Sequence, residues 1–127
     1  MRRIVLDMQC AMFAEAIARA LKSSDPDYII RRSQKPSDTA ALCRSSHACV
    51  LLMEVTGSAL WSLSERLKIR DAVKTSMPDC KIALLVDEKA DAPLADAVRQ
   101  AKKDGLVDNF IYCSVSPSYL FAVIDTL

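Results

Sequence analysis

Residues 49–55 read Cys-Val-Leu-Leu-Met-Glu-Val, an apolar run that is interrupted only by one acidic residue near its end. Its apolar residues are continuous rather than alternating, which is typical of a strand buried on both faces of a parallel sheet. Four further short runs have a similar character. The predicted strands lie at residues 3–8, 28–32, 49–55, 81–86 and 109–113.

The stretches between these strands have the spacing of amphipathic helices. The predicted helical stretches lie at residues 13–21, 37–42, 60–76, 94–101 and 117–127. In the stretch 60–76 the apolar phase slips near Ile69, which leaves open a bend or a broad buried face. Ser116 is a predicted N-cap before Pro117. The last helix is then expected to bury a stripe that consists of Tyr119, Leu120, Val123, Ile124 and Leu127.

Strands and helices therefore alternate along the whole chain. This order predicts an α/β fold in which right-handed crossovers place helices on both faces of a parallel sheet. Only two glycines occur, which argues against an all-β fold rich in tight turns. In doubly wound folds, ligands bind at the carboxyl ends of the strands. Candidate functional residues are therefore expected at residues 7–10, 54–57, 86–88 and 113–116.

Composition limits the classes of function. The 127 residues are expected to form one domain, 1–127, and 17 Lys and Arg against 16 Asp and Glu give a net charge of +1. This balance predicts neither direct nucleic-acid binding nor attraction to a membrane. The apolar runs are too short for a membrane span, and the start does not read as a secretory signal. Five cysteines at wide spacing fit reduced, mostly buried thiols, so a cytoplasmic protein is expected.

The order and length resemble the receiver domain of bacterial response regulators in two-component phosphorelays, over essentially the whole chain. The resemblance implies a CheY-like, flavodoxin-like (βα)5 doubly wound sheet with strand order 2-1-3-4-5. Receivers carry an acidic pair after the first strand and an aspartate phosphoacceptor after the third. A Thr or Ser follows the fourth strand, and a Lys-Pro follows the fifth. The carboxylates hold Mg²⁺, and metal and lysine neutralise charge on the transferred phosphoryl group.

Most of these positions have changed in this sequence. Asp7 keeps the first acidic position, but Met8 stands at the second, and a thioether is a poor ligand for Mg²⁺. Glu54 stands at the phosphoacceptor position. Val86 replaces the Thr or Ser, and Cys113 replaces the lysine. The departures predict a degenerate receiver, or pseudo-receiver, with no cofactor beyond a weak Mg²⁺ site at Asp7 and Glu54.

Simpler interpretations remain open for single residues. Asp7 could cap the next helix or meet solvent instead of binding a cation. Glu54 could be a solvated strand end, or a permanent charge that imitates a phosphorylated acceptor. Asp87 and Glu88 fit a solvated loop, although they could also supply oxygens to a metal.

The resemblance also implies a partner surface. In receivers, the fourth helix, fifth strand and fifth helix form the usual face for dimers or protein partners, here roughly residues 94–127. Tyr112 stands where receivers often keep an aromatic switch residue, and Cys113 follows it. The expected function is a non-enzymatic signalling module that acts through protein contacts or dimerisation. The alternatives are a working phosphoacceptor receiver and the regulatory part of a longer DNA-binding regulator.

Overall fold

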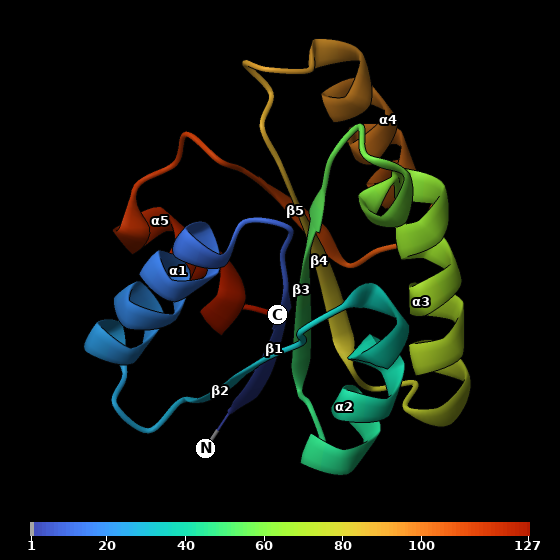
Figure 1. Ribbon diagram of the computed structural model, residues 1–127. Coiled ribbons are helices and arrows are strands. Elements are labelled where there is room, and N and C mark those ends of the chain that lie inside the picture. Colours follow the sequence, from blue (N-terminus) through green and yellow to red (C-terminus); the bar gives the residue numbers. More distant parts are fainter. Residues whose placement is uncertain (1) are drawn as a thin grey trace.

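Five parallel strands form one sheet in the order β2-β1-β3-β4-β5 (Figure 1). The computed structural model describes residues 2–127. The strands are β1 (Arg3–Asp7), β2 (Ile29–Arg32), β3 (Val50–Val55), β4 (Lys81–Val86) and β5 (Asn109–Tyr112). The predicted strands and their order are confirmed. β1, β3 and β4 are buried along most of their length, which is why their sequences are continuously apolar.

Helices cover both faces of this sheet. The helical elements are α1 (Ala11–Ser24), η1 (Pro36–Asp38), α2 (Thr39–Ser46), η2 (Ala59–Trp61), α3 (Leu63–Ser76), α4 (Ala92–Lys103) and α5 (Pro117–Asp125). Figure 1 shows α1 and α5 on one side of the strands and α2, α3 and α4 on the other. The doubly wound α/β prediction is therefore confirmed.

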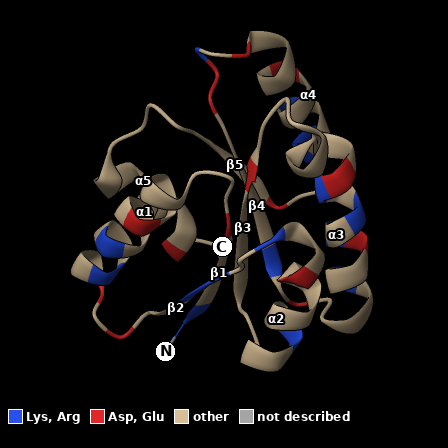
Figure 2. Ribbon diagram, in the orientation of Figure 1, with Lys and Arg blue, Asp and Glu red and all other residues tan. Residues whose placement is uncertain are grey.

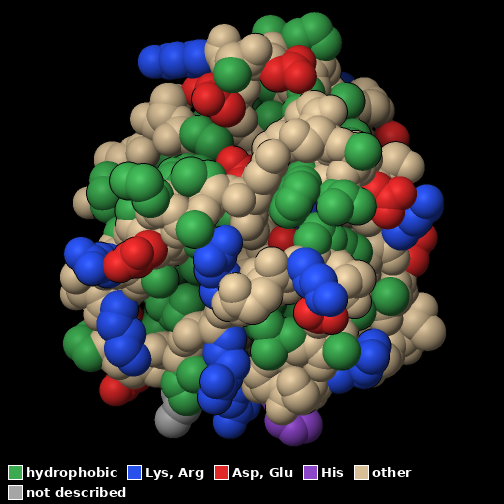
Figure 3. Space-filling view, in the orientation of Figure 1, with side chains coloured by type: hydrophobic (Ala, Val, Ile, Leu, Met, Phe, Trp, Pro, Cys, Tyr) green, Lys and Arg blue, Asp and Glu red, His purple; other side chains and the backbone are tan. Residues whose placement is uncertain are grey.

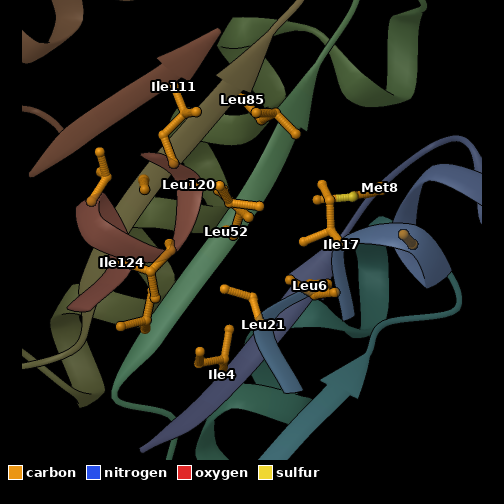
Figure 4. Close-up of a cluster of buried hydrophobic side chains, with 14 of the residues drawn as sticks. Ile4, Leu6, Met8, Ile17, Leu21, Leu52, Leu85, Ile111, Leu120 and Ile124 are labelled. Atoms are coloured by element: carbon orange, nitrogen blue, oxygen red, sulfur yellow. The ribbon is translucent and has the colours of Figure 1, made fainter. Parts of the chain in front are cut away.

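The two faces hold two separate apolar cores. Side chains of a strand alternate between the faces, so neighbouring residues of β1 belong to different cores. Ile4, Leu6 and Met8 pack with α1 and α5 in the first core (Figure 4). Val5 packs instead in the second core, which lies under α2, α3 and α4. Which core a strand-end residue faces thus follows from its parity along the strand.

The structure differs from the expected helix boundaries most clearly at α2 and at the start of α3. The helix after β2 does not end at Leu42 but extends to Ser46, and Asp38 precedes it without a capping hydrogen bond from its side chain. Leu60 lies in η2 and is 59% exposed, because α3 begins only at Leu63. α3 is one continuous helix of 14 residues, capped by the Ser62 hydroxyl, which accepts from the Glu65 N–H.

The last helix is capped as predicted, because the Ser116 hydroxyl accepts a hydrogen bond from the Tyr119 N–H at 3.2 Å. Its buried stripe is narrower than expected. Leu120, Val123 and Ile124 are buried, whereas Tyr119 is 55% exposed. Cys10 is exposed as well, although most cysteines were expected inside. Within residues 2–127, no helix combines the length and the apolar character that crossing a bilayer requires.

Candidate functional site

The alternation of side chains divides the candidate residues between the two faces of the sheet. Met8 lies in the core under α1 and α5, and Cys113 packs against that core. Val86 and Tyr112 belong to the opposite core, under α2, α3 and α4. Asp7, one residue before Met8 and two after Val5, points to this second face. The structure therefore does not gather all the candidates into one pocket.

Asp7 is buried and paired with an arginine from α3. Arg66 Nη1 lies 2.6 Å from Asp7 Oδ2, and Arg66 Nη2 donates to Asp7 Oδ1 at 3.2 Å. The two side chains are 0% and 1% exposed, respectively. Burial lowers the pKa of Arg66, while the Asp7 carboxylate acts against this shift. Arginine remains charged even so, because its ordinary pKa lies far above neutrality.

The remaining polar atoms of this pair are also satisfied. Arg66 Nε donates to the Glu54 carbonyl oxygen at 2.7 Å, and Nη2 also donates to the Asp7 carbonyl oxygen at 3.0 Å. The Thr39 hydroxyl lies 2.6 Å from Asp7 Oδ2 and 2.8 Å from the Ser33 hydroxyl. These contacts connect the ends of β1 and β3 with α2 and α3. Buried charges are tolerated when they are paired and hydrogen-bonded in this way.

Glu54 is half-buried and faces the loop after β1. Its Oε1 accepts a hydrogen bond from the Gln9 N–H at 2.9 Å. The Gln9 side chain extends this contact: its Oε1 accepts from the Thr56 hydroxyl and its Nε2 donates to the Ser58 hydroxyl. The loops after β1 and β3 are therefore joined to one another. Glu54 is thus a structural acceptor in the loop network and not only a solvated charge.

An acidic cleft of about 340 Å³ opens beside Glu54. Its wall includes Asp87 and Asp91. Figure 2 shows acidic positions along the loop after β4 that carries both residues. Both carboxylates already accept backbone hydrogen bonds. Asp87 Oδ1 accepts from the Lys89 and Ala90 N–H groups, and Asp91 Oδ1 caps α4 at Leu94. Three negative side chains around one cleft would oppose the approach of an anionic phosphodonor.

Val86 and Cys113 provide no hydroxyl or cation to this cleft. Val86 is fully buried. Burial, together with the carboxylates of Asp87, Glu54 and Glu88, raises the pKa of the half-buried Cys113 thiol to about 12. The Cys113 thiol is therefore neutral at pH 7. In the receiver domains that this sequence resembles, a lysine stands at this position. Tyr112 lies on the other face, where its hydroxyl accepts a hydrogen bond from Arg99 at 2.5 Å.

These residues do not fit a Mg²⁺ ion. Such an ion needs several oxygen ligands at octahedral positions. Both Asp7 oxygens accept hydrogen bonds from Arg66, and Met8 supplies a thioether inside an apolar core. Among residues 2–127, no group of three or more His, Cys, Asp or Glu side chains is arranged to hold a metal. The guanidinium of Arg66 instead provides the positive charge that faces Asp7.

Arg66, Thr39 and Ser33 were not among the candidates from the sequence. The phase slip in residues 60–76 was the available signal, because Arg66 lies on the buried face of α3 together with Val73. A charged residue at a core position breaks the apolar stripe without bending the helix. Ser33 and Thr39 carried no signal, since Ser33 lies in a polar stretch that reads as a loop and Thr39 lies in the first turn of the helix predicted at residues 37–42.

Comparisons with known proteins place the fold. No protein-family model matches the sequence, and no curated protein matches it. Solved structures do match. A CheY-like response-regulator receiver domain from Methanospirillum hungatei JF-1 has a TM-score of 0.78 at 14% identity, covering 99% of this chain and 92% of that one. CheY4 from Vibrio cholerae has a TM-score of 0.76 at 13% identity, covering 99% and 98%.

The response regulator TrrA from Thermotoga maritima, solved in complex with Mg²⁺ and BeF, is similar over the same extent. Its TM-score is 0.76 at 15% identity, covering 99% of this chain and 98% of that one. The chain therefore has the fold of a CheY-like response-regulator receiver domain. At these identities the likeness establishes the fold, and the chemistry has to be argued from this chain's own residues.

Proposed function

We propose that this chain is a pseudo-receiver: a non-enzymatic signalling module of two-component type that works in the cytoplasm without Mg²⁺-dependent phosphorylation. The buried ion pair between Asp7 and Arg66 carries this proposal. Receiver chemistry needs a free carboxylate on β1 to hold the metal. Here that carboxylate is enclosed by Arg66 and Thr39, so a metal could bind Asp7 only by breaking a buried pair.

The surroundings of Glu54 support the same conclusion. A phosphoryl group on Glu54 would need positive charge nearby to stabilise its transfer. The cation that interacts with Glu54 is Arg66, whose four hydrogen bonds are directed to Asp7 and to the Glu54 carbonyl oxygen. Cys113 is neutral where a lysine would act. Glu54 itself accepts a hydrogen bond from the Gln9 N–H, so it has a structural role.

Signalling would then proceed through protein contacts, at a surface formed by α4, β5 and α5. β5 is an edge strand, and its half-buried aromatic side chains Phe110 and Tyr112 lie beside the exposed Tyr119. Lys102 lies 5.8 Å from the centre of the Phe110 ring. Aromatic side chains are enriched in protein interfaces. We propose this surface for a protein partner or a second copy of the chain.

An amide NMR titration tests the chemical part. The uniformly labelled protein is titrated with Mg²⁺ and then with beryllofluoride, a phosphoryl mimic. The proposal expects no saturable shifts at Asp7, Glu54 or residues 112–114. Saturable shifts at these positions, accompanied by Mg²⁺-dependent modification from a small phosphodonor, would instead establish a working phosphoacceptor receiver.

The partner surface needs a separate test. Tyr119→Glu places a charge at its exposed centre, and Tyr119 is accessible enough for the variant to fold. Sedimentation velocity of the wild type and of this variant would show self-association and its loss. Met12→Glu is the matched control, because Met12 is 82% exposed and lies on α1, outside α4, β5 and α5. Equal effects of both variants would contradict an interface on α4, β5 and α5.

A further inference from the structure

A basic cleft lies at the amino ends of the strands, opposite the candidate site. It has a volume of about 410 Å³ and opens between β2 and the end of α2. The polar residues of its wall are Arg3, Arg31, Ser45, Ser46 and His47. Ile29 and Leu42 form its apolar part. Figure 3 shows basic side chains gathered near the histidine, coloured purple, at the lower edge of the molecule.

The sheet register explains why two arginines meet there. Arg3 of β1 pairs with Ile29 of β2, and Val5 pairs with Arg31. Because side chains alternate along a strand, Arg3, Val5 and Arg31 share the face on which α2 packs. α2 ends at Ser46, and His47 follows it in the left-handed region with φ 53°. The helix thus ends beside the two guanidinium groups.

These guanidinium groups lack internal counter-ions. Among residues 2–127, neither Arg3 nor Arg31 has a carboxylate oxygen within 4.0 Å. The last carbonyls of α2 are also engaged, because Cys43 O accepts from the Ala48 N–H at 3.0 Å and Arg44 O from the His47 N–H at 3.3 Å. Two like charges thus face one cavity with no anion between them.

The wider surroundings strengthen this positive potential. Residues 28–49 contain four basic residues, Arg31, Arg32, Lys35 and Arg44, against a single acid, Asp38. The chain as a whole has a net charge of only +1. Positive charge is therefore concentrated around β2 and α2, while Glu54 near the end of β3 and the acids of the loop after β4 lie at the other end of the sheet (Figure 2). Such a cleft attracts anions over a distance of about one Debye length, roughly 8 to 10 Å.

We propose that this cleft binds a small molecule that carries a phosphate monoester. Arginine forks match the oxygens of a phosphate in paired, charge-assisted hydrogen bonds. The Ser45 and Ser46 hydroxyls already donate to the Leu42 carbonyl, so Arg3, Arg31 and the His47 imidazole are the available donors. Ile29 and Leu42 can contact the organic part of the ligand. The volume is within the range of small-molecule sites.

The lining also distinguishes between anions of different kinds. It contains no aromatic ring besides the imidazole of His47, so it lacks a platform on which nucleic-acid bases could stack. The cleft is independent of the proposed function, because it lies at the other end of the strands and shares no residue with the acidic cleft.

NMR titration with ribose 5-phosphate and with inorganic phosphate tests the proposal, at ionic strength held constant with chloride. We expect saturable shifts for the amides of Arg3, Arg31, Ser45 and His47. Arg3→Gln and Arg31→Gln are each expected to weaken binding about tenfold, the loss of one charge-assisted hydrogen bond. Both side chains are exposed, so these variants should fold, which their amide spectra would show.

The double variant Lys102→Gln/Lys103→Gln is the matched control. It removes two positive charges from α4 and should leave ribose 5-phosphate binding unchanged. The proposal is overturned if no phosphate compound gives saturable shifts, or if the control weakens binding as much as the arginine variants do. Binding of only a phosphoserine peptide or a short DNA duplex would overturn the assignment to a small molecule.

Discussion

The guanidinium of Arg66 is bound to the carboxylate of Asp7 by two hydrogen bonds, 2.6 and 3.2 Å long, in a fully buried position. Arg66 comes from α3 and Asp7 from the end of β1, 59 residues earlier. A charge-assisted pair of this kind joins two layers of the fold. It also places a fixed positive charge beside the carboxylate at the end of β1. The domain therefore does not need a metal to neutralise this carboxylate.

Removal of Arg66 should destabilise the domain strongly. Arg66→Met keeps a long side chain but leaves Asp7 buried without a counter-ion. Loss of one partner from a buried pair costs about 3–5 kcal/mol. Urea denaturation should show this decrease in the free energy of unfolding.

Two comparisons separate charge from packing. The double variant Asp7→Leu/Arg66→Met removes both charges and should recover part of the loss, because no unpaired ion remains buried. Lys68→Gln, on the exposed face of α3, should change stability by less than about 0.5 kcal/mol. If the double variant lost as much free energy of unfolding as the two single variants together, the pairing would be contradicted.

Thr39 should contribute to the same network to a smaller extent. Thr39→Val keeps the shape of the side chain but removes the hydroxyl that donates to Asp7. Loss of a hydrogen bond to a charged acceptor costs about 1.5–3 kcal/mol. The loss should be smaller when Arg66→Met is already present, since the two residues share Asp7 as a partner. Additive losses in urea denaturation would show that the hydroxyl acts independently.

Asp108 should make stability depend on pH in the acidic range. Burial disfavours its charge, but the Ile82 N–H at 2.8 Å and the Lys74 ammonium at 3.2 Å together lower the pKa of this carboxyl below its usual value. The folded state thus holds the proton less tightly than the unfolded state. The stabilisation is complete above the unfolded pKa of about 4 and is lost as the pH falls through the folded pKa.

Asp108→Asn should therefore be less stable than the wild type at pH 7, and the difference should shrink as the pH approaches about 3. Urea denaturation at several pH values measures this difference. The control Asp79→Asn changes an exposed residue on the loop before β4. If the difference in free energy of unfolding between the wild type and Asp108→Asn stayed constant with pH, it would contradict a lowered pKa of Asp108 in the folded state.

The strands could be predicted because burial on both faces leaves a direct trace in the sequence, whereas their order followed from the resemblance to receiver domains. Residues 49–53 and 82–86 are continuously apolar, and the stretches between the strands have helical spacing. The predicted helix boundaries were less accurate where a polar side chain, such as a cap, decides where a helix begins. Leu60 continues the apolar spacing of α3 in the sequence, but Ser62 caps that helix two residues later and leaves Leu60 in η2.

The candidate site was predictable only in part. The resemblance located Asp7 and Glu54 at strand ends, but it could not show their partners. Arg66 lies 59 residues from Asp7, and sequence spacing contains no information on such a contact. Tyr119 shows that the exposure of a side chain can also be missed from the sequence. It lies next to the buried Leu120 at the edge of the predicted stripe, and only the packing of α5 against the sheet decides that it faces outward.

The five cysteines should differ in their rates of alkylation, according to their exposure and to the charges of neighbouring side chains. Cys10 is exposed before α1, whereas Cys43 and Cys80 are buried, and burial raises their pKa to about 12 and about 11. Cys113 is half-buried, and its pKa is also about 12. At pH 8 only about one Cys113 in 10⁴ would carry the reactive thiolate. Alkylation with iodoacetamide, followed by mass spectrometry, should therefore modify Cys10 first and Cys113 far more slowly.

Two variants show whether Cys113 is protected by its surroundings. Cys10→Ser should remove the fast phase of alkylation and leave the slow phases unchanged. Glu54→Gln removes one of the carboxylates that raise the pKa of Cys113, so it should speed modification of Cys113 with little effect on Cys43, on the opposite face of the sheet. Equal alkylation rates of Cys10 and Cys113 in the native protein would contradict the acidic, half-buried environment that the structure gives Cys113. If Glu54→Gln sped both Cys43 and Cys113, general loosening of the fold would be the cause.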